Sequence, residues 1–166
     1  YGRAVERDPG FARGHAGLAM AWVVLPVFAP EVAFDSAVAL AAASANRALQ
    51  LDSTLADAHL ALAYALKMHW RFAEAEPHFR SAVALAPGDP AVRHWYGLFL
   101  YTTGRLREAL VEMERARELD PFHTTIMTDA AGALYYARRY PEAVALTRRA
   151  LELDSTKSDT WFILGL

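Results

Sequence analysis

The sequence predicts an all-α fold in which antiparallel helix pairs stack one behind another. The stretch from Pro87 to Pro121 recurs, with substitutions, every 34 residues on either side of itself, and nothing in the chain reads as a β-strand. Small residues return at fixed places in each copy, in columns formed by Ala75, Ala109 and Ala143 and by Ala82, Ala116 and Ala150. Such a period is typical of helix-turn-helix arrays, in which each unit buries its apolar face against the next.

The small columns have a physical reason. Alanine or glycine at a helix crossing lets the two axes approach to about 8 to 10 Å. Leucine in place of Ala109 or Ala116 is therefore expected to overpack the crossing, at about 1 to 3 kcal/mol. A further small column, placed on the first helix of each pair, contains Ala63, Gly97, Ala131 and Gly165.

The repeat resembles the tetratricopeptide repeat. Its first helix carries a bulky residue followed by Leu and a small residue, as in Trp161, Leu164 and Gly165. Its second helix carries a small-bulky-small pattern followed by proline, as in Ala109, Met113, Ala116 and Pro121. The resemblance implies a right-handed α-α superhelix whose first helices line a concave groove.

The elements follow in order along a single array over residues 1–166. Residues 1–9 are expected to end a preceding repeat and residues 156–166 to form the first helix of a truncated fifth, so that the chain is cut from a longer protein. The complete repeats between them are residues 10–53, 54–87, 88–121 and 122–155. Helices are expected over residues 10–25, 35–51, 55–69, 72–86, 106–119 and within 124–154.

The first repeat is ten residues longer than the period, because 44 residues separate Pro9 from Ser53. The excess is placed in the inter-helix turn at residues 25–34, LPVFAPEVAF, since loops tolerate added length. This segment is apolar, and two readings stay open: it folds back over its own helix pair, or it forms a lip over the groove or a partner contact.

Several residues predict helix boundaries and surface pairs. Asp89 is a natural N-cap and Pro90 a natural first helical residue. Gly104 separates the two helices of the third repeat, and Pro77 is tolerable if it falls in the first turn of its helix. Glutamate and arginine three residues apart, Glu112 with Arg115 and Glu114 with Arg117, are expected to form ion pairs on the outer face.

The second half of the fourth repeat is locally basic, with Arg138, Arg139, Arg148 and Arg149. Two readings stay open: these residues form a solvated face, or they form a site for an acidic partner.

Composition limits the function classes. The chain is 54% hydrophobic and 22% charged with a net charge of −2, so it lacks the basic excess typical of nucleic-acid binding. It contains no cysteine, which excludes disulfides and thiolate metal sites. The opening residues YGRAVERDPG show no secretory signal pattern, and Pro26 and Pro30 interrupt the uncharged run at 14–30. We expect neither a membrane span nor nucleic-acid binding, and a cytoplasmic location.

No motif for catalysis or for a cofactor is present. There is neither a phosphate-binding GxxxxGK[ST] loop nor a GxGxxG sequence, and none of the six histidines has a close metal-ligand spacing. His15 and His59 occupy the bulky packing position of Trp161, and Asp52, Asp120 and Asp154 recur at repeat boundaries, which indicates structural roles. We expect no cofactor, no metal and no enzymatic activity.

The resemblance also implies which side chains face the groove. They are Leu60, His94, Thr128 and Phe162; Tyr64, Leu98, Gly132 and Leu166; Lys67, Tyr101 and Tyr135; and Met20 with Val23 from the first repeat. Family members that clamp a terminal carboxylate use Lys, Arg and Asn here, whereas this face is aromatic and aliphatic. The expected partner is a protein or peptide with apolar anchors.

Three functions remain open on the sequence. The segments MHWRFAEAEPHFRSAVAL and AVRHWYGLFLYTTGRLREAL resemble the repeat regions that follow winged-helix, cyclase or protein-kinase domains, which implies an interaction or sensing segment of a larger bacterial regulatory protein. The repeats also resemble the substrate-recruiting arms of glycosyltransferases. A third possibility is a self-association module that pairs copies through the open ends or through residues 25–34.

Overall fold

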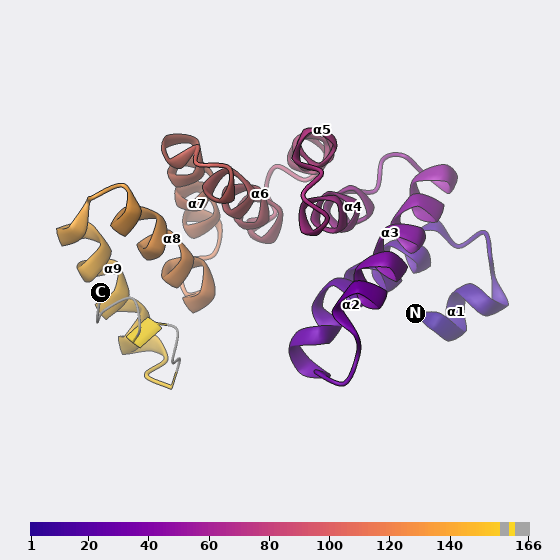
Figure 1. Cartoon of the computed structure of the whole chain (residues 1–166), viewed down its shortest axis with the longest axis horizontal. Coiled ribbons are helices and arrows are strands. Elements are labelled where there is room, and N and C mark those ends of the chain that lie inside the picture. The colour runs from indigo at the N-terminus through magenta and orange to yellow at the C-terminus, as the bar shows by residue number, and fades with distance from the viewer. Residues whose placement is uncertain (157–159, 162–166) are drawn as a thin grey trace. The chain divides into compact units, whose positions relative to one another are not determined.

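The computed structural model describes residues 1–156 together with 160 and 161, and these residues form α-helices and no strand (Figure 1). The helices are α1 (Gly2–Arg7), α2 (Ala12–Phe28), α3 (Phe34–Leu51), α4 (Ala56–Met68), α5 (Phe72–Leu85), α6 (Pro90–Thr102), α7 (Leu106–Leu119), α8 (Thr124–Tyr136) and α9 (Tyr140–Leu153). The chain divides into two compact units, Tyr1–Pro87 and Gly88–Leu166. The prediction of an all-α array of helix pairs is confirmed.

The first unit pairs α2 with α3 and α4 with α5, and α4 also packs against α2 and α3. Its interior is built largely from alanine, because Ala41, Ala45 and Ala48 on α3 have no exposed surface. The largest fully buried side chain of the unit is that of Phe79 on α5. Small side chains at the crossings keep the helices close, as the small columns of the sequence predicted.

The second unit pairs α6 with α7 and α8 with α9, and α7 packs against α8. Met113 on α7 is fully buried in a cluster with Leu134 of α8 and Leu146 of α9. Gly97 lies where α6 meets α7, since a Cβ added there would be 2.8 Å from the Cγ of Met113. The unit therefore needs glycine at this crossing.

One backbone position recurs in the turn inside each of three helix pairs. Trp70, Gly104 and Arg138, spaced 34 residues apart, all have a positive φ of 60°, 79° and 60°. This left-handed conformation suits glycine and strains other residues. The expected helix break at Gly104 is confirmed, and the same turn forms in two repeats without glycine.

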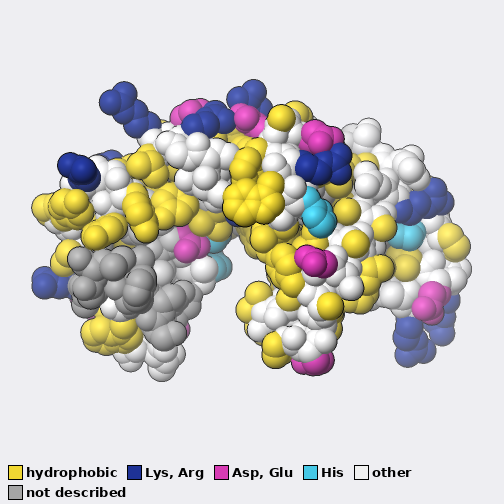
Figure 2. Space-filling view, in the orientation of Figure 1, with side chains coloured by type: hydrophobic (Ala, Val, Ile, Leu, Met, Phe, Trp, Pro, Cys, Tyr) yellow, Lys and Arg dark blue, Asp and Glu magenta, His cyan; other side chains and the backbone are white. Residues whose placement is uncertain are grey.

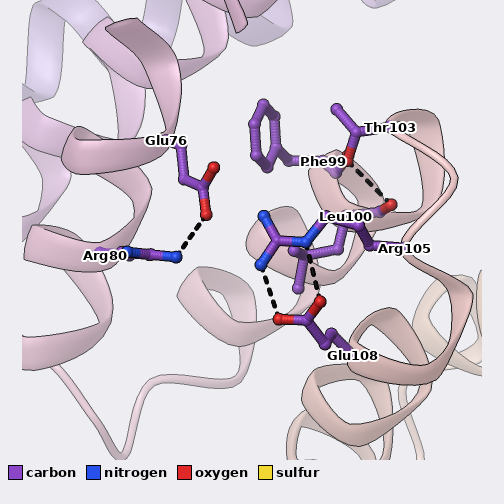
Figure 3. Close-up of polar contacts among 7 residues, drawn as sticks. All are labelled: Glu76, Arg80, Phe99, Leu100, Thr103, Arg105 and Glu108. Atoms are coloured by element: carbon purple, nitrogen blue, oxygen red, sulfur yellow. Dashed lines mark hydrogen bonds and ion pairs between the residues drawn. The ribbon is translucent and has the colours of Figure 1, made fainter. Parts of the chain in front are cut away.

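The residue that follows each positive-φ position is an arginine at the N-cap of the next helix, and it forms an ion pair with a glutamate in the first turn of that helix. Arg71, Arg105 and Arg139 each donate through Nε and Nη2 to both carboxylate oxygens of the glutamate three residues later, which are Glu74, Glu108 and Glu142. Figure 3 shows the Arg105–Glu108 pair. In the same view Thr103 donates its hydroxyl to the Phe99 and Leu100 carbonyls and so ends α6. The recurring R-x-x-E is visible in the sequence.

The turns between repeats share a second arrangement. The Asp52 and Asp154 carboxylates accept hydrogen bonds from the backbone N–H and the hydroxyl of the threonine two residues later. The next carbonyl, that of Ser53 or Ser155, accepts a ring N–H from His59 or Trp161, at 3.1 and 2.8 Å. These contacts confirm a structural role for the boundary aspartates and for the histidine in the bulky position.

Asp89 caps α6 as predicted, because its carboxylate accepts the Ala91 and Val92 backbone N–H groups. Pro77 is the sixth residue of α5, beyond its first turn, and the helix continues through it to Leu85, as the expected tolerance of this proline requires. One expected ion pair is wrong. Glu112 pairs with Arg93 of α6 at 2.7 Å instead of with Arg115, which pairs with Glu118.

The extra length of the first repeat lies mainly in its helices. α2 continues through Pro26 to Phe28, and α2 and α3 have 17 and 18 residues, against 13 or 14 in the later pairs. The expectation of a long loop at 25–34 is therefore wrong. Val27 and Phe28 are 78% and 81% exposed, so they do not fold back over their own helix pair. Within the described residues no helix has the length and hydrophobicity that a bilayer crossing requires.

Candidate functional site: the first-helix faces of the two units

The expected site residues of the first unit lie on α2 and α4, which pack against each other. Leu60 is only 2% exposed and belongs to the core. Met20, Tyr64 and Lys67 are partly exposed. Burial raises the pKa of the Tyr64 phenol, which therefore stays protonated and can donate a hydrogen bond. This face offers a thioether, a phenol ring and one cation to a ligand.

In the second unit two expected groove residues are occupied by internal hydrogen bonds. His94 on α6 is 7% exposed, and its Nε2 lies 2.7 Å from a carboxylate oxygen of Asp129 on α8. The hydroxyl of Thr128, 4% exposed, lies 2.7 Å from that of Thr160 and donates to the Thr124 carbonyl. The resemblance implied that His94 and Thr128 contact the ligand, as it did for Leu60. The structure instead buries all three, and we leave them out of the contact surface.

Two further expected residues of this unit, Tyr101 and Tyr135, belong to a tyrosine cluster. We define this cluster as Tyr101, Tyr135, Tyr136 and Tyr140. The ring of Tyr101 on α6 meets Tyr136 edge to face at 5.7 Å. Tyr135 meets Tyr136 at 5.5 Å and Tyr140 at 5.4 Å in the same manner. Such edge-to-face pairs contribute about 0.5 to 1.5 kcal/mol each beyond burial. The cluster is therefore held in shape before any ligand arrives.

The tyrosine cluster combines an apolar surface with polar edges. Leu98, Tyr101 and Tyr135 are partly buried and pack against the core of the unit, whereas Tyr136 and Tyr140 are 59% and 49% exposed. Burial, and then the neighbouring Tyr136 phenol, raise the pKa of Tyr101. The Tyr101 phenol thus remains a neutral hydrogen-bond donor at physiological pH. Large, stiff rings of this kind bind a partner at a low cost in side-chain entropy.

Sequence reasoning found Tyr101 and Tyr135 but missed Tyr136 and Tyr140. The missing signal was the turn: Tyr136 ends α8 and Tyr140 opens α9, so the tight connection between these helices brings both rings back to Tyr135. Gly132, also expected in the groove, is buried. Phe162 and Leu166 lie outside the described residues.

The described residues offer no metal centre, since no three His, Asp or Glu side chains converge in them. The one histidine pair among them is His59 on α4 with His78 on α5, whose Nδ1 atoms lie 2.9 Å apart. Because His59 donates through Nε2 to the Ser53 carbonyl, its Nδ1 accepts the proton of His78 Nδ1 in the neutral pair. Burial, and then His59, lower the pKa of His78. The pair joins two helices and is a structural contact.

Comparisons with known proteins agree with this architecture. Residues 71–126 match the tetratricopeptide repeat family. Over 119 residues, 68% of the chain, it is 30% identical to anaphase-promoting complex subunit 3 of Schizosaccharomyces pombe (strain 972 / ATCC 24843). The chain spans only 17% of that relative's length.

Solved structures extend the similarity to nearly the whole chain. A thermophilic TPR protein of Thermus thermophilus has a TM-score of 0.79 at 17% identity, covering 98% of this chain and 84% of that one. The pilF protein of Pseudomonas aeruginosa has a TM-score of 0.75 at 22% identity, covering 91% of this chain and 68% of that one. Identities this low establish the fold alone. The chain therefore has the fold of a tetratricopeptide-repeat protein, and its residues 71–126 match that family.

Proposed function

We propose that the chain is a non-catalytic scaffold that binds a protein or peptide segment through apolar anchors. Tetratricopeptide repeats are generally scaffolds of this kind. The observation that carries the proposal is the tyrosine cluster, in which four rings from α6, α8 and α9 hold one another in place while two of them stay about half exposed. Tyr64 with Met20 and Lys67 provides a smaller contact surface in the first unit.

The contact chemistry follows from the side chains of the cluster. Each ring can bury apolar area against an aliphatic or aromatic anchor, and the phenol groups at the edge of the cluster can hydrogen-bond to the backbone of the ligand, although the Tyr101 and Tyr136 hydroxyls already bond to each other. Tyr101 contacts both the core of its unit and Tyr136, so its truncation removes one ring of the surface and the support of a second, exposed one. Truncating an anchor ring at an interface commonly weakens binding by more than about 1 kcal/mol.

A display selection tests the proposal. A random dodecapeptide library is selected on the immobilised chain, and the enriched peptide is titrated against wild type, Tyr101→Ala and Tyr101→Phe. We expect Tyr101→Ala to weaken binding about tenfold and Tyr101→Phe, which keeps the ring, to weaken it about threefold or less. Failure to enrich any peptide, or equal affinity for wild type and Tyr101→Ala with unchanged unfolding midpoints, contradicts the proposal.

The wider setting is also a proposal. We place the chain in the interaction or sensing segment of a larger bacterial regulatory protein in the cytoplasm. The substrate-recruiting arm of an enzyme such as a glycosyltransferase is the second setting. The small share of the curated relative that the chain spans supports a position within a longer protein. Sequencing the gene on both sides distinguishes the two settings, since the first requires a regulatory effector domain and the second a catalytic domain.

One observation favours self-association as a second function. Val27, Phe28 and Phe34, at the junction of α2 and α3, are 78%, 81% and 42% exposed and form a run of exposed apolar side chains. Such surface is typical of contact between copies. Sedimentation of wild type and of Phe28→Glu checks this: we expect a concentration-dependent dimer that the charge abolishes, and a monomer at all concentrations for wild type excludes it.

A further inference from the structure

A trough on the second helices of the second unit has no role in the proposed function. Two adjoining cavities, of about 520 and 710 Å³, share Leu110, Glu114 and Arg139. Each is within the range of volumes of ligand-binding pockets. Together they form one depression between α7 and α9, and we call it the α7–α9 trough.

The trough follows the length of α7. Its lining on that helix runs from Leu106 to Arg117, which at 1.5 Å per residue is about 16 Å. Ala130 and Leu134 of α8 contribute to its lining, and α9 lines it as far as Arg149. A depression of this length fits a short peptide segment better than a small molecule.

The charge of the trough is opposite in sign to that of the chain as a whole. Its lining includes five arginines and two glutamates, Arg107, Arg117, Arg138, Arg139 and Arg149 with Glu114 and Glu142, for a formal charge of +3. The whole chain carries −2. Figure 2 shows Lys and Arg side chains interspersed with hydrophobic side chains on the surface around α7 and α9.

The arginines of the trough differ in whether a carboxylate already neutralises them. Arg117 pairs with Glu114 at 2.6 Å, Arg139 pairs with Glu142, and Arg149 pairs with Glu152, which lies outside the lining, at 2.8 Å. Arg107 and Arg138 are exposed, and neither has an ion pair with any residue that the structure describes. Both residues line the larger cavity, so two arginines that no described carboxylate neutralises border the same space.

Apolar side chains accompany these cations. The larger cavity is lined by Leu106, Leu110 and Val111 of α7, and Val111 is 61% exposed. Tyr136, 59% exposed, closes the cavity on the side of α8. A segment lying here would meet apolar and cationic groups in alternation along its length.

We propose that the α7–α9 trough binds an acidic peptide segment with aliphatic side chains. Carboxylates of the segment pair with Arg107 and Arg138, since guanidinium groups bind carboxylates through paired N–H donors. Aliphatic side chains of the segment bury themselves against Leu110 and Val111. The two glutamates of the lining disfavour a nucleic-acid backbone, which presents a phosphate at every nucleotide. Tyr136 belongs both to this lining and to the tyrosine cluster, but the cations and aliphatic side chains that would hold the acidic segment lie on α7 and in the turn before α9, so the site goes beyond the proposed function.

A pair of labelled peptides tests the proposal. The probe is a fluorescein-labelled peptide of three Glu-Glu-Leu-Leu blocks, and its counterpart carries Gln in place of every Glu. Fluorescence anisotropy at low salt is expected to show at least tenfold tighter binding of the Glu peptide, and its affinity falls as salt screens the pairs. In amide NMR spectra the shifted signals are expected in α7 and residues 136–149.

Variants with matched charge locate the binding. Arg107→Gln with Arg138→Gln is expected to weaken the Glu peptide about tenfold. The control, Arg115→Gln with Arg148→Gln, removes the same charge from α7 and α9 outside the trough lining and is expected to leave affinity within about twofold. Tyr64→Ala, in the first unit and away from the trough lining, is also expected to leave it unchanged, which separates this site from the first-helix surface of that unit. If the double trough variant loses helical content, Arg107→Gln alone is measured.

Several results would overturn the proposal. They are equal weakening by the trough variant and by its control, equal affinity for the Glu and Gln peptides, shifts confined to α6 and α8, or no binding at millimolar peptide. A twelve-nucleotide single-stranded DNA that binds as tightly as the Glu peptide, with the same loss in the trough variant, would also overturn it in favour of a phosphate site.

Discussion

Replacing Arg138 by glycine relaxes a turn that the backbone holds in a left-handed conformation, with φ at 60°. An L-residue costs about 1 to 2 kcal/mol there relative to glycine. Glycine also increases the conformational entropy of the unfolded chain, and this offsets about 0.4 to 1 kcal/mol of the stabilisation gained by relaxing the turn. Arg138 has no ion pair with a described residue to lose. We therefore expect Arg138→Gly to stabilise the protein by about 0.5 to 1 kcal/mol.

The other two copies of this turn supply the controls. Gly104→Ala, at φ 79°, is expected to destabilise the protein by a similar amount. Trp70→Gly relaxes the same strain but loses the edge-to-face contact with Phe72 at 5.7 Å, worth about 0.5 to 1.5 kcal/mol, so its net effect is close to zero.

Urea unfolding followed by circular dichroism measures all three variants, and each kcal/mol corresponds to about 2 to 4 °C in Tm for a chain of this size. Destabilisation by Arg138→Gly, or no change on Gly104→Ala, would refute the assignment of strain to this position.

Three further predictions concern the helix crossings and the histidine pair. Gly97→Ala places a methyl group against Met113 and is expected to lower the unfolding free energy by about 1 to 2 kcal/mol in urea titrations. Ala116→Leu, at a position with no exposed surface, is expected to lower it by about 1 to 3 kcal/mol, and an unchanged Tm would contradict the packing. Since burial and His59 lower the pKa of His78, the contribution of this pair is present above about pH 6.5 and is lost as the pH falls. The unfolding free energy, measured by urea titration at several pH values, is expected to fall by less than about 1.4 kcal/mol per pH unit from this pair. His78→Phe is expected to reduce that pH dependence.

Much of the fold could be predicted because the same helix pair, with small residues at its crossing, recurs along the chain. Each helix crossing needs a small residue, so the 34-residue period carries the small columns. Asp89 and Gly104 were assigned correctly from their own chemistry instead, since the equivalent positions in the neighbouring repeats are Leu55 and His123 for Asp89 and Trp70 and Arg138 for Gly104. The length of α2 was not predicted correctly, because two prolines close together, Pro26 and Pro30, are typical of a loop. Proline inside a helix is tolerated when packing holds the rest of the helix, as Pro77 in α5 also shows.

The candidate site was harder to predict than the fold. The period places His94 and Thr128 in a groove-facing column, but their exposure depends on polar partners 35 and 32 residues away. Asp129 and Thr160 satisfy them internally, and that depends on side-chain geometry rather than on spacing. The sequence shows the locally basic stretch with Arg138, Arg139, Arg148 and Arg149 and leaves a site for an acidic partner open there. It does not show the α7–α9 trough, because only the fold brings Arg107 and Arg117 of the preceding repeat to the same depression.

The central claim is that a ligand with apolar anchors binds at the first-helix faces, chiefly at the tyrosine cluster. The most direct measurement is an amide NMR titration of the labelled chain with the display-selected peptide. We predict that the largest shifts fall at Leu98, Tyr101, Tyr135 and Tyr136, with smaller ones near Tyr64. Shifts confined to α7 and α9, or spread evenly over the chain, would contradict it.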